Sequence, residues 1–201
     1  MLDMTPPLAI TGRTKIVGPS RAPVDLDAWN AEPVRRSHNC LSFALAAMGA
    51  GWSLAGDLAI NHYAENRMRP PPPIWVGAAL KRDGLTQIHA DAVSPGRGHV
   101  ISAFEKWDGW DFHVRYLSLC GTWFEKIGDL EAGVCTQDVL RHQNTAGEAY
   151  SFAGFFTIPD QGVAVFHPDI LHPIEDLRRE AWRKSSSILR PYPAQTLHAA
   201  P

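Results

Sequence analysis

The pattern of hydrophobic and polar residues changes character about halfway along the chain. Residues 39–48 form an almost unbroken apolar run, which predicts a core helix that ends at the turn containing Gly49 and Gly51. Residues 57–67 and 74–82 are two further predicted helices, and the prolines of residues 69–73 predict an extended connector. The first half of the central region is therefore expected to be mainly helical.

From residue 85 onward the pattern has the shorter period of β-strands. We expect strands over residues 85–93, 99–107, 112–119, 122–127 and 152–158. Asp108-Gly109 and Cys120-Gly121 supply tight turns between the middle three. A helical part followed by an antiparallel meander predicts an α+β domain.

The two ends of the chain differ in composition from this central part. Residues 1–36 are rich in proline and polar side chains, which predicts an irregular N-terminal arm. Residues 174–185 have the pattern of a charged helix, and the rest of the C-terminus offers little to bury. We therefore expect an arm (1–36), a domain (37–159), and a C-terminal helix and tail (160–201).

Composition excludes several classes of function. With 45% hydrophobic and 20% charged residues, the chain is typical of a soluble globular protein. Its net charge of -2 and the lack of a basic run argue against a nucleic-acid partner. The first ten residues lack the features of a secretory signal, and the apolar stretch 41–48 is too short to span a membrane. We expect no membrane partner, and a protein that is cytoplasmic or exported by a signal-independent secretion system.

The cysteines point to thiol chemistry rather than to crosslinks. Cys40, Cys120 and Cys135 are odd in number and have no paired spacing, so we expect free thiols and neither a disulfide framework nor a structural zinc site. No metal and no cofactor is expected.

Cys40 is the candidate nucleophile because it opens the predicted core helix. The helix dipole and free backbone N–H groups favour its thiolate by roughly 0.3–2 kcal/mol. A free thiol is only about 3% ionised at pH 7, so a neighbouring imidazolium would also be needed. The position of Cys40 fits an ordinary buried thiol equally well.

His113 and Glu125 are the expected partners of this cysteine. They lie twelve residues apart about the Cys120-Gly121 turn, so they can share one face of adjacent strands. Glu125 could then orient the His113 imidazole, which would complete a Cys-His-Glu triad. His99 lies more than about 20 Å from His113 along its strand and is expected to be a packed or solvated residue. His38 precedes the helix and could only help to cap it.

Three stretches of the chain resemble one little-characterised bacterial family. Residues 111–128 resemble its motif D-Y-H-F-Y-R-x-D-x-D-G-x-W-S-H-K-x-G without a gap. Residues 39–45 resemble N-C-Y-x-Y-A-L, and residues 79–85 resemble A-L-x-x-D-G-L. That family looks like a distant branch of the papain-like superfamily, which includes NlpC-type cell-wall peptidases.

The resemblance implies a papain-like α+β fold, in which an N-terminal nucleophile helix packs on an antiparallel sheet. It also implies a thiol peptidase or amidase that cleaves an amide bond in a peptide, a protein or a peptidoglycan peptide. A partner protein for the arm or the tail is a further expectation. The chain departs from the motif at Glu125, which replaces histidine, at Tyr116, which replaces arginine, and at the turn residues Leu119 and Cys120.

Two other functions are compatible with the same residues. An exported toxin-like effector, acting as a deamidase, protease or transferase, could use the same triad. A catalytically inactive binding module could keep the fold without the chemistry, and the departures from the motif favour that alternative.

Overall fold

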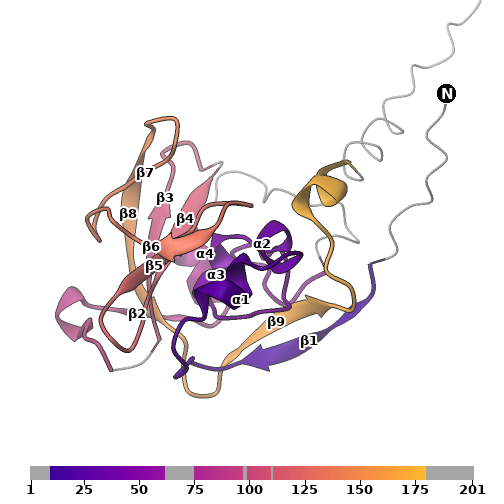
Figure 1. Cartoon of the computed structure of the whole chain (residues 1–201). Coiled ribbons are helices and arrows are strands. Elements are labelled where there is room, and N and C mark those ends of the chain that lie inside the picture. The colour runs from indigo at the N-terminus through magenta and orange to yellow at the C-terminus, as the bar shows by residue number, and fades with distance from the viewer. Residues whose placement is uncertain (1–9, 62–74, 97–98, 110, 180–201) are drawn as a thin grey trace, which may run out of the picture.

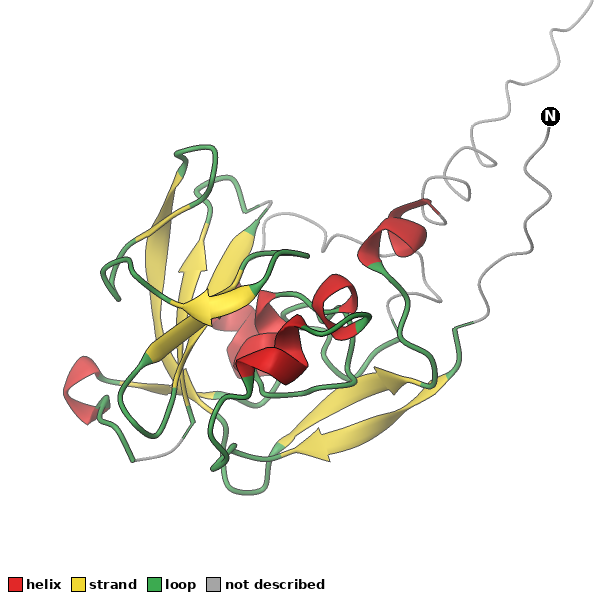
Figure 2. Ribbon diagram, in the orientation of Figure 1, coloured by secondary structure: helices red, strands yellow, loops and turns green. Residues whose placement is uncertain are grey.

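The protein is described here by a computed structural model, which covers residues 10–61, 75–96, 99–109 and 111–179. Over these residues the chain is mainly antiparallel β-sheet with a few short helices (Figures 1 and 2). The strands are β1 (Gly12–Val17), β2 (Thr86–Ile88), β3 (Val100–Glu105), β4 (Phe112–Leu117), β5 (Trp123–Lys126), β6 (Ala132–Val134), β7 (His142–Gln143), β8 (Ala149–Thr157) and β9 (Val163–Pro168).

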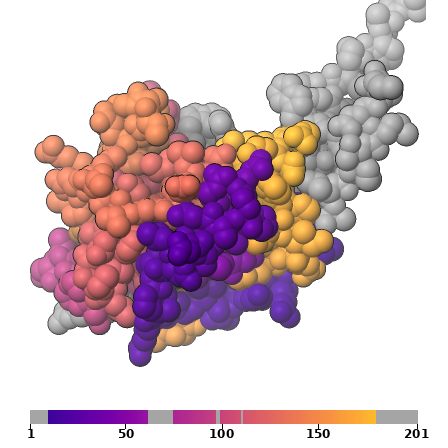
Figure 3. All heavy atoms as spheres, viewed as in Figure 1, coloured from indigo at the N-terminus to yellow at the C-terminus, as the bar shows by residue number. Residues whose placement is uncertain are grey.

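The strands form one large sheet and one two-stranded ladder. The large sheet has the order β2-β8-β3-β4-β5-β6, and β7 pairs with β8. Every pairing in it is antiparallel, which short loops between sequential strands permit. The ladder joins β1 to β9, so segments near both ends of the chain lie side by side (Figures 1 and 3).

The helices are short and lie mostly between the sheet and the ladder (Figure 1). They are α1 (Leu26–Asn30), α2 (Val34–Ser37), α3 (Cys40–Ala44), α4 (Val76–Arg82) and the 3-10 turn η1 (Ala90–Ala92), and residues 174–179 are also helical. None of the helices formed by the described residues has the length and apolar character needed to cross a bilayer.

The predicted papain-like α+β fold class is wrong. The sequence predicted a helix over residues 39–48, whereas α3 contains five residues and ends where Ala46 takes a left-handed backbone conformation, at φ 53°. An unbroken apolar run cannot distinguish a long core helix from a short helix followed by buried turns, because both bury every side chain. Strands therefore dominate a fold for which the sequence suggested balanced helix and sheet.

The strand predictions were more accurate. Strands β3, β4, β5 and β8 confirm four of the five predicted segments, and the fifth divides into β2 and η1. The helix expected at 74–82 is α4, and part of the one expected at 174–185 is present. Residues 57–61 form a turn and irregular backbone rather than helix, and 62–67 and 69–73 lie outside the described residues. The sequence did not predict β1, β6, β7 or β9.

Two buried histidines hold the segments around α3 in place. The His99 Nδ1 atom accepts a hydrogen bond from the Ser20 backbone at 2.9 Å, and its Nε2 donates to the carbonyl of Ala44. The His38 Nε2 atom accepts from the Gly49 backbone at 2.9 Å. Both rings use one nitrogen as donor and one as acceptor, so both are neutral. His99 and His38 therefore have structural roles.

The N-terminal arm is not irregular throughout. Residues 12–17 of the arm form β1, and residues 163–168 of the C-terminal region form its partner β9. Ile16 of β1 is exposed, and its strand carries mostly polar side chains on an outer edge. The sequence therefore gives no alternating pattern that would predict β1. Its partner β9 also lies far away in the sequence.

Replacing His99 with alanine should lower the free energy of unfolding by about 2–4 kcal/mol, because one buried and one partly buried backbone group lose their partner. Urea denaturation would measure this. His89→Ala is the matched control, since His89 is exposed, and it should change stability by less than about 0.5 kcal/mol. Equal effects of the two substitutions would contradict the structural role of His99.

Candidate functional site

The register of the β3, β4 and β5 strands divides their side chains between two faces. Arg115 pairs with Glu125 across β4 and β5, and His113 pairs with Phe104 across β3 and β4. Because side chains alternate along a strand, His113, Arg115 and Glu125 share one face of the sheet. Val114 points to the opposite face, which packs against α3.

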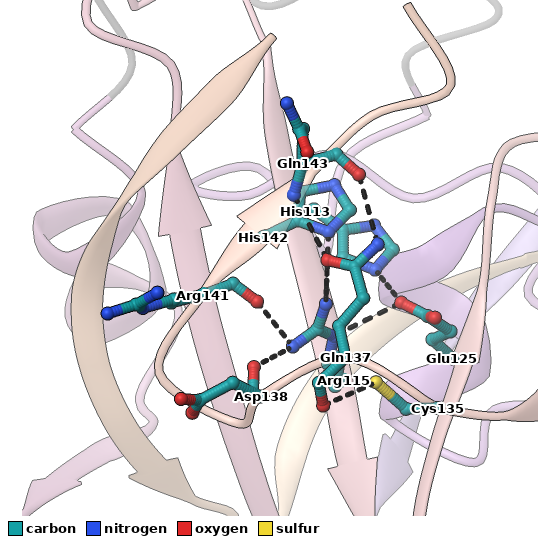
Figure 4. Close-up of polar contacts among 9 residues, drawn as sticks. All are labelled: His113, Arg115, Glu125, Cys135, Gln137, Asp138, Arg141, His142 and Gln143. Carbon is teal, nitrogen blue, oxygen red and sulfur yellow. Dashed lines mark hydrogen bonds and ion pairs between the residues drawn. The ribbon is translucent and has the colours of Figure 1, made fainter. Parts of the chain in front are cut away.

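Arg115 lies at the centre of the polar face and is completely buried (Figure 4). Its Nε donates to Glu125 Oε2 at 3.1 Å, and its terminal nitrogens donate to the Gln137 side chain and to the His142 Nδ1 atom. The backbone carbonyls of Asp138 and Arg141 accept further hydrogen bonds from Arg115. One guanidinium thus ties the loop before β7 to the sheet.

His113 and Glu125 form a directly hydrogen-bonded pair. The His113 Nε2 atom lies 3.1 Å from Glu125 Oε2 (Figure 4). Burial lowers the pKa of His113, an effect that the Glu125 carboxylate only partly offsets. Burial alone would raise the pKa of Glu125, but His113 and the Arg115 guanidinium bring it down to about 2. The pair therefore consists of a neutral imidazole and an ionised carboxylate at neutral pH.

His142 completes the polar cluster. Its ring stacks on that of His113 with centroids 4.0 Å apart and an angle of 14° between planes. Because Nδ1 accepts a hydrogen bond from Arg115, the ring is neutral. Burial, together with the neighbouring His113 and Arg115, lowers the pKa of His142 to about 3.

His113, Glu125 and His142 could in principle offer ligands to a metal ion, since their ligand atoms lie within 4.8 Å of one another. Two features of their geometry oppose this. Imidazole lone pairs lie in the ring plane, and two stacked, nearly parallel planes cannot both pass through one ion. The Arg115 guanidinium already places a positive charge on Glu125 and His142. The arrangement suits an arginine-centred network better than a metal centre.

Cys40 approaches β4 from the other face. It is the first residue of α3, where Asn39 and Ser42 form a reciprocal capping box. The side chain is 7% exposed and belongs to the apolar core that includes Val114. Burial raises the pKa of the Cys40 thiol to about 12, although hydrogen bonds from the Val114 and Leu41 backbones act against this.

The structure places the three residues selected from sequence around β4: Cys40 of α3 lies against one face of the strand, and His113 on the other face contacts Glu125 of β5. The Cys40 sulfur contacts the backbone of Val114, the residue after His113, and His113 contacts Glu125. No hydrogen bond within the described part of the chain joins Cys40 to His113. The His113 Nδ1 atom makes no hydrogen bond to any described residue. His99 and His38 are engaged elsewhere. Cys120 is a free thiol on an exposed turn, whereas Cys135 is a free thiol beside Glu125 and donates to the Gln137 carbonyl at 3.6 Å (Figure 4).

Sequence analysis missed Arg115, Gln137 and His142. Arg115 could have been found, because it lies two residues after His113 and must share its face of a strand. His142 and Gln137 reach the site through a loop whose course no periodic pattern predicts. The buried network is therefore larger than a triad.

Comparisons with known proteins give limited information about this chain. No family model matches it, and no solved structure matches it. Among curated proteins, the chain is similar to insoluble matrix shell protein 1 of Ruditapes philippinarum, with 31% identity over 105 residues. That stretch is 52% of this chain and 65% of the relative, so the chain spans less than two thirds of the relative's length. This similarity assigns the chain neither a fold nor an activity.

Arg115→Lys should destabilise the protein by about 3–5 kcal/mol, because an ammonium cannot replace the five hydrogen bonds and Glu125 stays buried. Urea denaturation would show the loss. Arg141→Lys is the matched control: only its backbone carbonyl bonds to Arg115, and its own side chain points away (Figure 4). A similar loss in both variants would contradict the central role of Arg115.

The protein should lose stability as the pH falls from 6.5 to 4. An unfolded histidine titrates near 6.5, whereas burial lowers the pKa of His38 and of His99 to about 4. Between these values the unfolded chain binds more protons, so lowering the pH favours unfolding. Each ring should contribute about 2 kcal/mol of loss between pH 7 and pH 5. Urea denaturation at both pH values checks this, and unchanged stability would refute it.

Proposed function

We propose that the protein is a thiol hydrolase that cleaves an amide bond, with Cys40 as nucleophile, His113 as base and Glu125 as the group that orients His113. One observation carries the proposal. Cys40, seventy-three residues before His113 in the sequence, lies against the Val114 backbone, next to a histidine already held by a carboxylate. A nucleophile, a base and an orienting acid on separate elements are the parts that such chemistry requires.

The protonation states favour proton transfer during attack rather than a preformed ion pair. The Cys40 thiol is protonated at rest, because burial raises its pKa. His113 is neutral, and its Nε2–H points to Glu125, so the Nδ1 lone pair can accept a proton. Because Cys40 and His113 lie on opposite faces of β4, the proposed transfer runs through a water molecule at the start of the strand, before the residues that pair with β5. As the Cys40 sulfur attacks a carbonyl carbon, its proton would pass by this route to Nδ1 and then to the leaving amine. Water would release the acyl group from sulfur.

Glu125 has two partners in this scheme. Its Oε2 accepts from both His113 and Arg115, each at 3.1 Å. Arg115 keeps Glu125 ionised, and the ionised carboxylate stabilises the imidazolium that forms when His113 takes a proton. Arg115 thus supports the pair without contact to a reacting atom.

A catalytically inactive binding module is the second candidate. The observation that favours it is the 7% exposure of Cys40 within an apolar cluster, which suits an inert core thiol. The mollusc relative is named as a matrix protein of the shell, a role of the structural kind. The two candidates differ in whether native Cys40 reacts.

Alkylation by iodoacetamide at pH 7.5, followed by mass spectrometry of peptides, separates these candidates. The hydrolase should be labelled at Cys40 while folded, and His113→Ala should slow that labelling at least tenfold because the base is lost. Cys120 is the internal control: it is exposed, and its rate should not depend on His113. Labelling of Cys40 only in denaturant would reject the hydrolase and favour the binding module.

A further inference from the structure

Lys126 is a buried lysine that the proposed chemistry does not yet use. It follows Glu125 on β5, and alternation turns its side chain toward the face that packs against α3. The side chain is 0% exposed. Its Nζ donates to the carbonyls of Gly128 and Leu130, each at 2.7 Å. Lysine is almost never fully buried unless its charge is paired.

The described part of the chain supplies no carboxylate that forms an ion pair with Lys126. Two carbonyls satisfy two of its three N–H groups and leave the third. Among the acidic groups that raise the pKa of Lys126, the Cys40 thiol has the largest effect, followed by Asp129 and Glu32. Arg35 adds a repulsive charge. Val114, against which Cys40 packs, and Lys126 are the next positions along the β4/β5 register after Arg115 and Glu125, so Lys126 and Cys40 share the α3 face of the sheet.

The same interaction is seen from the side of Cys40. Two charged groups act on its thiol: Asp111, which opposes a thiolate, and Lys126, which favours one. The Lys126 neighbour Phe124 lies in one apolar cluster with Phe43 of α3, so this face of β5 and the helix that begins with Cys40 are packed together. Lys126 therefore places a positive charge on the face of the sheet against which Cys40 packs.

We propose that Lys126 is a positioning residue whose ammonium group stabilises the thiolate of Cys40. The inference rests on the proposed function, in which Cys40 is the nucleophile. When the Cys40 proton has passed to His113 Nδ1, the negative charge left on sulfur lies on the face of the sheet that carries the Lys126 ammonium. No other bond forms or breaks in that step. The buried sulfur then has a counter-charge in a core where water cannot supply one.

The pH dependence of Cys40 alkylation tests this in the chain with Cys120→Ser and Cys135→Ser. Burial lowers the pKa of Lys126 to about 8. Between pH 7 and this value the labelling rate should change little, because the Cys40 proton moves to His113, which is already neutral, and no proton leaves the protein. Above it the rate should fall about tenfold per pH unit, because the reactive state keeps the lysine proton that the resting protein has lost. A rate that stays constant or rises from pH 8 to pH 10 would overturn the proposal.

Two substitutions test whether Lys126 causes the break, that is, the change in slope near pH 8. Lys126→Met removes the charge at similar length, and it should slow labelling at pH 7 at least tenfold and abolish the break. Lys126→Arg keeps a charge that does not titrate, so labelling should persist without a break near pH 8. If Lys126 had only a structural role, its substitution would alter stability but not the pH dependence of the labelling rate. If Lys126→Met does not fold, the profile of the parent chain still decides.

The outcomes separate this inference from the proposed function. Labelling of Cys40 that depends on His113 but shows no break near pH 8 would overturn the role of Lys126 and keep the hydrolase. A Cys40 that stays unlabelled from pH 6 to pH 10 would overturn both. A break that survives Lys126→Met would assign the titration to another group and refute the inference.

Discussion

The pairing of β4 with β5 is the constraint on which the candidate site depends. Its register places Arg115 opposite Glu125, and strand alternation then fixes which side chains face which layer. His113 joins Glu125 and Arg115 on one face, while Lys126 turns to the face that packs on α3. A shift of one residue would exchange the two sets and bury the carboxylate in the apolar core.

The two faces of this hairpin stabilise their buried charges in different ways. On the polar face, Arg115 distributes one positive charge over a carboxylate, a histidine, an amide and two carbonyls. On the opposite face, Lys126 donates hydrogen bonds to two backbone carbonyls. A charge that is fully hydrogen-bonded can remain in the interior, and this requirement explains why the loop before β7 folds over the sheet.

The buried histidines connect stability to the same region. His99 joins the segment before α1 to the end of α3, and His38 joins the segment before α3 to the turn after it. His99, which directly precedes β3, holds the end of α3 against the sheet, and His38 fixes the turn that follows it. The neutral rings of His99 and His38 therefore maintain the position of the candidate nucleophile. As the pH falls, these histidines would be protonated before the Glu125 carboxylate.

The sequence by itself determined the local elements and their hairpin register. Alternation and turn residues predicted β3, β4, β5 and β8, and the twelve-residue spacing predicted the contact between His113 and Glu125, because both depend only on neighbours along the chain. Tertiary structure alone decided the rest. Contacts between distant segments produce the pairing of β1 with β9, the short length of α3, the network around Arg115 and the burial of Cys40 against β4. Such contacts leave no periodic signal in the sequence.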